Sequence, residues 1–143
     1  MGLAVRFGSK SLYHLRTCDE RLIRVAKLGI SWGILDFAVV EGHRGRARQS
    51  EAFKARPQRS KLPWPKGKHN GFPSKAFDLA PWVDEGIPWK DSRYWYHLAG
   101  IILAASRHLS IPLRWGGDWD SDSDLSDQGF FDLGHFEIKE KKT

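Results

Sequence analysis

The spacing of apolar residues along the chain predicts where its helices lie. Over residues 11–30 apolar side chains recur at roughly helical intervals, and Asp19 can begin a new helix within this stretch. The longest helix is predicted over residues 94–109, where apolar residues share one face. A shorter helix is expected over residues 46–55.

Short runs rich in β-branched and aromatic residues predict strands between these helices. The expected strands cover residues 35–40, 75–79, 113–115 and 136–138. Residues 57–73 contain four prolines and two glycines, which predicts a loop. Because helices and strands are mixed without a repeating strand–helix–strand order, the sequence predicts an α+β fold.

Length and composition favour one folded domain. A chain of 143 residues fits a single unit covering residues 1–143. Its one cysteine, Cys18, cannot form an internal disulfide and is expected to be a small buried residue. No run approaches the roughly 18 apolar residues of a membrane span, and the first residues lack the pattern of a secretory signal. We therefore expect synthesis in the cytoplasm.

The formal net charge of +6 indicates attraction to polyanions such as nucleic acid, anionic lipid or an acidic cell envelope. Basic residues are dense over residues 44–68, with Phe53 and Trp64 interleaved. That composition leaves open a binding module without catalysis.

Two histidines and two aspartates suggest metal-dependent hydrolysis. Catalytic zinc takes three ligands from His, Asp or Glu, and a further carboxylate must accept the proton of the attacking water. His69 and Asp78 lie on either side of a Gly/Pro turn, and Asp132 precedes His135 by three residues. The spacing alone is also consistent with structural roles, in which His69 is an exposed loop histidine. Asp132 would then be a turn carboxylate and Asp78 a strand-end carboxylate.

The end of the chain predicts which way these side chains point. If a strand starts near His135, this imidazole shares a face with Glu137 while Phe136 and Ile138 pack inward.

Three ordered segments resemble a known superfamily. They are Val-Glu-Gly-His-Arg at residues 40–44 with Gln49, residues 68–81, and residues 115–120 followed by residues 131–137. These segments are similar to the arginine segment and the two zinc motifs of the D-alanyl-D-alanine carboxypeptidase and L-alanyl-D-glutamate peptidase superfamily. The likeness spans about residues 9–138 and is closest to the phage endolysins of that superfamily.

The resemblance implies a fold and a cofactor. It implies a single compact α+β domain of the hedgehog and DD-peptidase type, in which helices flank a small antiparallel sheet that carries the zinc site. One zinc ion per chain would be held by His69, Asp78 and His135.

The resemblance also implies roles for residues around the metal. Asp132 would be the general base, and Arg44 would bind a substrate carboxylate or stabilise the oxyanion. Gln49 and Ser74 are weaker candidates for substrate contact, and the alternative for Gln49 is that it only holds the arginine segment in place.

The chain departs from the superfamily at three points. Asp78 follows His69 by nine positions, more than in many members, and the extra residues fall in the Gly-Phe-Pro turn. Asp132 stands where many members have Glu, and Gly67 where many have Ser. None of these differences removes a ligand.

The likeness to phage endolysins favours cleavage of the L-alanyl-D-glutamate bond in peptidoglycan stem peptides. D-alanyl-D-alanine carboxypeptidase activity is the alternative. An endolysin would be made in the host cytoplasm, reach the cell wall through a holin-type release and act as a monomer. Its positive charge would attract the anionic envelope, and nucleic acid is not an expected partner.

An aspartate-rich run precedes the last predicted strand. Alternating carboxylates can bind calcium through their oxygen atoms, but they are more often typical of a solvated loop. The residues concerned are Asp118, Asp120, Asp122, Asp124 and Asp127.

Overall fold

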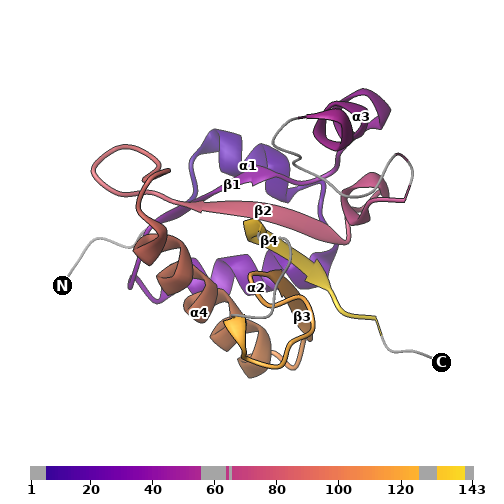
Figure 1. Ribbon diagram of the computed structural model, residues 1–143. Coiled ribbons are helices and arrows are strands. Elements are labelled where there is room, and N and C mark those ends of the chain that lie inside the picture. The colour runs from indigo at the N-terminus through magenta and orange to yellow at the C-terminus, as the bar shows by residue number, and fades with distance from the viewer. Residues whose placement is uncertain (1–5, 56–63, 65, 126–131, 141–143) are drawn as a thin grey trace.

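Two helices separated at Asp19 begin the fold. The computed structural model describes residues 6–55, 64, 66–125 and 132–140 (Figure 1). Helix α1 covers Ser9–Leu15 and α2 covers Glu20–Ser31, so the expected new start at Asp19 is confirmed. The Asp19 carboxylate caps α2 by accepting the backbone N–H of Arg21 at 2.9 Å. Helix α2 ends before Gly33, whose φ of +66° favours glycine.

A four-stranded antiparallel sheet forms the centre of the molecule and confirms the predicted α+β class. The strands are β1 (Phe37–Glu41), β2 (Ala76–Pro81), β3 (Leu113–Gly116) and β4 (Asp132–Ile138), in the order β1-β2-β4-β3. Strand β4 starts earlier than predicted because its first residue pairs with β3. The sequence Asp-Leu-Gly-His at residues 132–135 has low strand propensity, so this pairing could not be predicted from it.

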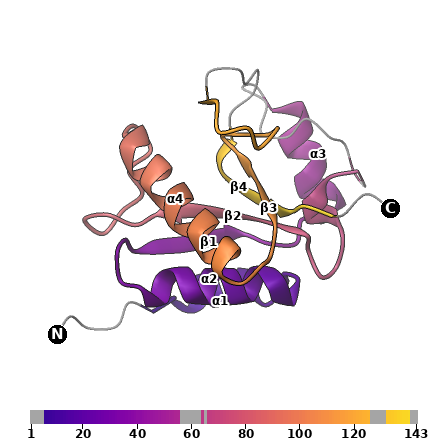
Figure 2. The same ribbon diagram turned by 90° about the horizontal axis from the view of Figure 1, so that it is seen from below.

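Helices lie on both sides of the sheet region. Helix α4 (Ser92–His108) packs on α2 and on three of the strands, while α3 (Arg46–Lys54) lies at the opposite end of the molecule from α4 (Figure 2). The 3-10 helix η1 (Lys68–Asn70) contacts β2. Within the part of the chain that the structure describes, no helix is long and apolar enough to cross a bilayer.

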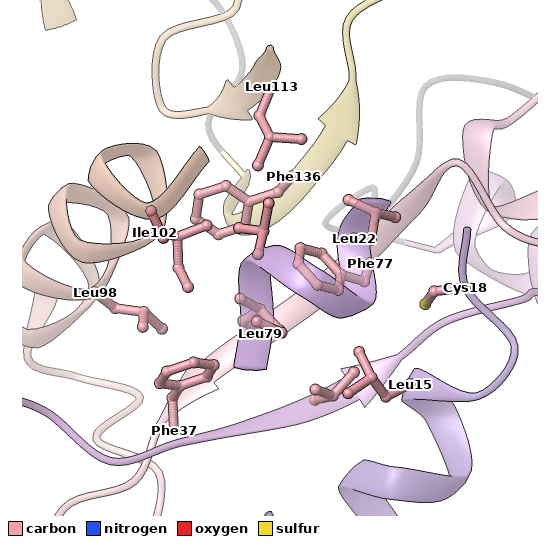
Figure 3. Close-up of a cluster of buried hydrophobic side chains, with 14 of the residues drawn as sticks. Leu15, Cys18, Leu22, Phe37, Phe77, Leu79, Leu98, Ile102, Leu113 and Phe136 are labelled. Atoms are coloured by element: carbon pink, nitrogen blue, oxygen red, sulfur yellow. The ribbon is translucent and has the colours of Figure 1, made fainter. Parts of the chain in front are cut away.

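The hydrophobic core lies between the sheet and helices α1, α2 and α4. Figure 3 shows its central side chains, which include Leu15, Cys18, Leu22, Phe37, Phe77, Leu79, Leu98, Ile102 and Phe136. Cys18 is buried there, as predicted. On β4, Phe136 and Ile138 are 0% and 1% exposed and belong to the core. The alternate residues His135 and Glu137 are therefore presented on the other face of the strand, as the alternation predicts.

Asp19 offers a test of how this fold is held together. Its carboxylate also binds Arg21 and Lys75, which lies next to β2, at 3.0 and 3.3 Å. The side-chain hydrogen bonds from Arg21 hold the pKa of Asp19 well below its ordinary value of 3.8. We expect Asp19→Ala to lower the free energy of unfolding by about 1 kcal/mol at pH 7.

The pH dependence of that loss follows from the lowered pKa. The stabilisation is fully present above the unfolded-state pKa and is lost as the pH falls through the folded-state value. Urea titrations should therefore show the two proteins converging as the pH is lowered below about 4. Glu20→Ala removes a neighbouring exposed carboxylate and is the control. If the difference in free energy of unfolding between the parent and Asp19→Ala stays constant across this pH range, the stabilising role of the charged Asp19 is contradicted.

Candidate metal centre

Three side chains from separate elements converge on one point. His69 comes from η1, Asp78 from β2 and His135 from β4, and the strand register places Asp78 directly opposite His135. His69 Nε2 lies 3.2 Å from Asp78 Oδ1 and 3.2 Å from His135 Nδ1. The third distance, from His135 Nδ1 to Asp78 Oδ1, is 3.1 Å.

This triangle fits a metal ion. Ligand atoms about 2.0 Å from a tetrahedral zinc ion lie about 3.3 Å from one another, close to the separations found here. A single proton can bridge only one pair of the three atoms, whereas a cation among them satisfies all three. Two imidazole nitrogens and a carboxylate oxygen are also a donor set typical of catalytic zinc.

The backbone carbonyl of Gly42 orients the His69 ring. The Nδ1–H of His69 donates to the Gly42 carbonyl oxygen at 2.7 Å, which leaves Nε2 facing Asp78 and His135. Gly42 follows β1 directly, and a Cβ atom there would collide with the Thr17 hydroxyl and the His14 carbonyl. Only glycine therefore lets the chain pass close enough to place this carbonyl.

Arg44 contacts the Asp78 carboxylate. Its Nη2 lies 3.3 Å from Asp78 Oδ2, the oxygen that does not face the histidines. Its Nε and Nη1 donate to Glu41 at 3.4 Å and to Gln49 at 2.9 Å. Buried Glu41 also binds Arg48 at 2.7 Å. The guanidinium is thus fixed beside the metal site by a charged network at the end of β1.

Strong electrostatic coupling marks the site. Burial disfavours a charged Asp78, but His69 and His135 outweigh burial and hold the pKa of Asp78 well below its usual range. Burial likewise opposes a charged His135, but hydrogen bonds to Asp78 and Glu137 raise the pKa of His135 to about 10. Such shifts are typical of functional sites.

Asp132 stands at the start of β4, three residues before His135. Burial, followed by the negative charge of Asp78, raises the pKa of Asp132 to about 6. A carboxyl whose pKa lies near neutrality suits a group that both accepts and returns a proton.

Comparisons with known proteins show the family of this chain. A family model described as phage L-alanyl-D-glutamate peptidase matches residues 3–139. The chain belongs to the phage L-alanyl-D-glutamate peptidase family. It is 30% identical over 139 residues to the L-alanyl-D-glutamate peptidase of Escherichia phage T5, covering 95% of this chain and 99% of that protein.

A solved structure shares the fold of this family member. It is the crystal structure of the Serratia marcescens L-Ala D-Glu endopeptidase ChiX, with a TM-score of 0.72 and 26% sequence identity. The match covers 95% of this chain and 91% of that one.

Two residues predicted to contact the substrate lie buried in this peptidase. Gln49 and Ser74 are both 0% exposed, so neither side chain has surface left for a substrate. Gln49 Oε1 accepts from Arg44 and from Asn70, which joins α3 to η1. The Ser74 hydroxyl donates to the Ala76 carbonyl at 2.6 Å. Both residues support the site, and sequence alone could not separate support from contact because burial depends on distant segments.

The aspartate-rich run is only partly gathered. Asp118, Asp120 and Asp122 each offer an oxygen within 4.8 Å of the others, and Asp118 accepts the backbone N–H groups of Asp122 and Ser123. Asp124 is not in this group, and Asp127 lies outside the described residues. Calcium binding in the family member stays a prediction.

Trp119, in the same loop, contacts the metal centre. Its ring lies 5.5 Å from that of His135 at an interplanar angle of 42°. No role was predicted from the sequence for Trp119, Gly42 or Glu41. The sequence signal for Trp119 was its place within the second motif, and the signal for Gly42 was a glycine at the end of a predicted strand.

Gly42→Ala tests how the peptidase positions His69. The added methyl must displace Thr17 or the backbone of α1, so the carbonyl that orients His69 should move. We expect a loss of about 1–3 kcal/mol of stability from overpacking, and weaker metal binding. Thermal unfolding with and without zinc measures both effects.

Gly45→Ala is the matched control, since nothing lies within 4 Å of the added carbon. A Gly42→Ala protein with unchanged zinc-dependent stabilisation would contradict the role of this carbonyl.

Proposed function

We propose that this chain is a zinc-dependent endopeptidase that hydrolyses the L-alanyl-D-glutamate bond of peptidoglycan stem peptides. The observation that carries the proposal is the convergence of His69, Asp78 and His135 within 3.2 Å beside Asp132, in a member of this peptidase family. A bound zinc ion supplies Lewis-acid polarisation of a carbonyl and lowers the pKa of water.

Asp132 is the residue that moves the proton. It takes a proton from the attacking water as the new C–O bond forms on the alanyl carbonyl carbon. It then returns that proton to the glutamate nitrogen as the C–N bond breaks, so one water is consumed and the charges balance. The raised pKa of Asp132 supports both directions of transfer.

Arg44 supports the reaction through its charge. Its contacts with Glu41, Gln49 and Asp78 hold the guanidinium beside the three converging side chains. A fixed positive charge near the site stabilises a developing oxyanion or holds a carboxylate of the D-glutamyl residue.

The relatives favour this bond over the carboxypeptidase alternative. Both the phage T5 protein and the Serratia marcescens enzyme are named for L-Ala-D-Glu cleavage. A binding module without catalysis has little need of two buried histidines facing a carboxylate, since desolvating such groups costs stability.

The remaining features of the proposal concern location and partners. The relation to a phage enzyme supports synthesis in the host cytoplasm, holin-type release and action on the wall. A single copy of the chain contains every proposed catalytic group. The net charge of +6 supports attraction to the anionic envelope, which salt would weaken.

The bond is tested by digesting purified peptidoglycan with the zinc-loaded protein. Mass spectrometry and end-group analysis should find new N-terminal D-glutamate and no release of free D-alanine. Addition of a chelator should stop the reaction and zinc should restore it. Release of D-alanine as the main product would favour the carboxypeptidase instead.

The role of Asp132 is tested by Asp132→Asn, which keeps the shape of the side chain but cannot accept the proton. We expect kcat to fall by at least about 10²-fold while one zinc ion per chain is retained. Asp84→Asn, in an exposed turn after β2, is the control. Full activity in Asp132→Asn would remove Asp132 from the mechanism.

A further inference from the structure

Glu137 places a carboxylate directly behind the metal centre. It lies two residues after His135 on β4, and its Oε1 is 2.9 Å from His135 Nε2. The side chains of His135 and Glu137 are only 10% and 9% exposed. This contact involves the ring nitrogen that faces away from Asp78 and His69, so it uses none of the three atoms that face one another.

The burial of Glu137 needs an energetic explanation. A carboxylate removed from water is destabilising unless it is hydrogen-bonded and paired. The cross-strand neighbour Arg114 on β3 approaches Oε2 only to 3.9 Å, and Arg114 Nε has no hydrogen-bond partner among the described residues. The shortest contact of Glu137 in that part of the chain is with His135.

That contact determines which ring nitrogen can bind a metal. A carboxylate accepts hydrogen bonds, so Nε2 of His135 keeps a proton, and Nδ1, which faces Asp78 and His69, is the nitrogen left to bind a metal. We propose that Glu137 is a positioning residue that fixes the tautomer and ring orientation of His135 for metal binding. The inference rests on the proposed metal centre and deepens it.

The two histidines are held by different acceptors. His69 donates to the neutral carbonyl of Gly42, whereas His135 donates to a carboxylate. A carboxylate partner makes an imidazole a more basic ligand than a carbonyl does. Glu137 therefore strengthens the His135 bond to the metal as well as orienting the ring.

Zinc affinity, measured on metal-free protein by competition with a chromophoric chelator, tests the inference without using peptidase activity. Glu137→Ala should weaken zinc binding by about 10–100-fold. Glu137→Gln retains an acceptor oxygen for the Nε2–H and should recover most of the loss.

Two control variants separate positioning from charge and packing. Glu140→Ala removes an exposed carboxylate from the same end of the chain and should leave the zinc affinity unchanged. Arg114→Ala removes the cross-strand partner of Glu137 but keeps its contact with His135, so it should bind zinc nearly as well as the parent. If Glu137 matters only through its pairing with Arg114, Arg114→Ala will weaken zinc binding as much as Glu137→Ala.

Nuclear magnetic resonance of the histidine rings in the zinc-loaded protein gives a second readout. The parent and Glu137→Gln should show a slowly exchanging proton on Nε2 of His135, and Glu137→Ala should lose it. Should Glu137→Ala fail to fold, as judged by near-ultraviolet circular dichroism, Glu137→Gln decides alone: zinc binding within about tenfold of the parent and a retained Nε2 proton support the inference.

Parent-like zinc affinity in a folded Glu137→Ala protein, or loss of the Nε2 proton in Glu137→Gln, would overturn it. Failure of the parent itself to bind zinc would instead overturn the proposed function.

Discussion

The antiparallel pairing of β2 with β4 is the constraint on which the site depends. It places Asp78 opposite His135, although the two residues are 57 positions apart in the chain. Because side chains alternate along a strand, the same pairing sends Phe77 and Phe136 into the core while the two polar residues meet on the opposite face. The pairing of β2 with β4 therefore determines both the packing of the core and the positions of the converging polar side chains. A shift of one residue in this register would bury the ligands and expose the phenylalanines.

The site also requires that each of the three converging side chains has a further contact that holds it in position. Two imidazole nitrogens and a carboxylate oxygen whose lone pairs face one another about 3 Å apart repel one another unless a proton or a cation lies between them. The rest of the folded chain must therefore hold these three groups in place. Gly42 does so for His69, Arg44 for Asp78 and Glu137 for His135. Gly42 and Arg44 belong to the segment directly after β1, and Glu137 belongs to β4. Because Gly42 also packs closely against His14 of α1, the geometry of the site depends on α1, the end of β1 and β4 together.

Local pattern was sufficient to predict much of this molecule. Helical periodicity located α2 and α4, alternation located the inward face of β4, and the ordered motifs pointed to the side chains of His69, Asp78 and His135, which converge and could hold a metal ion. What could not be predicted depends on distant segments. The burial of Gln49 and Ser74 follows from how η1, α3 and the end of β1 meet, and the early start of β4 follows from its ladder with β3. The close approach at Gly42 is likewise invisible until α1 is placed beside it.

The central claim is that two imidazoles and one carboxylate bind the catalytic metal. X-ray absorption at the zinc edge of the loaded protein tests it most directly. The account predicts two imidazole nitrogens and carboxylate or water oxygens at about 2.0 Å, with the imidazole signal halved in His135→Ala. A sulfur neighbour at about 2.3 Å would implicate Cys18, and a spectrum unchanged by His135→Ala would place the metal elsewhere. Either result would contradict the metal centre described here.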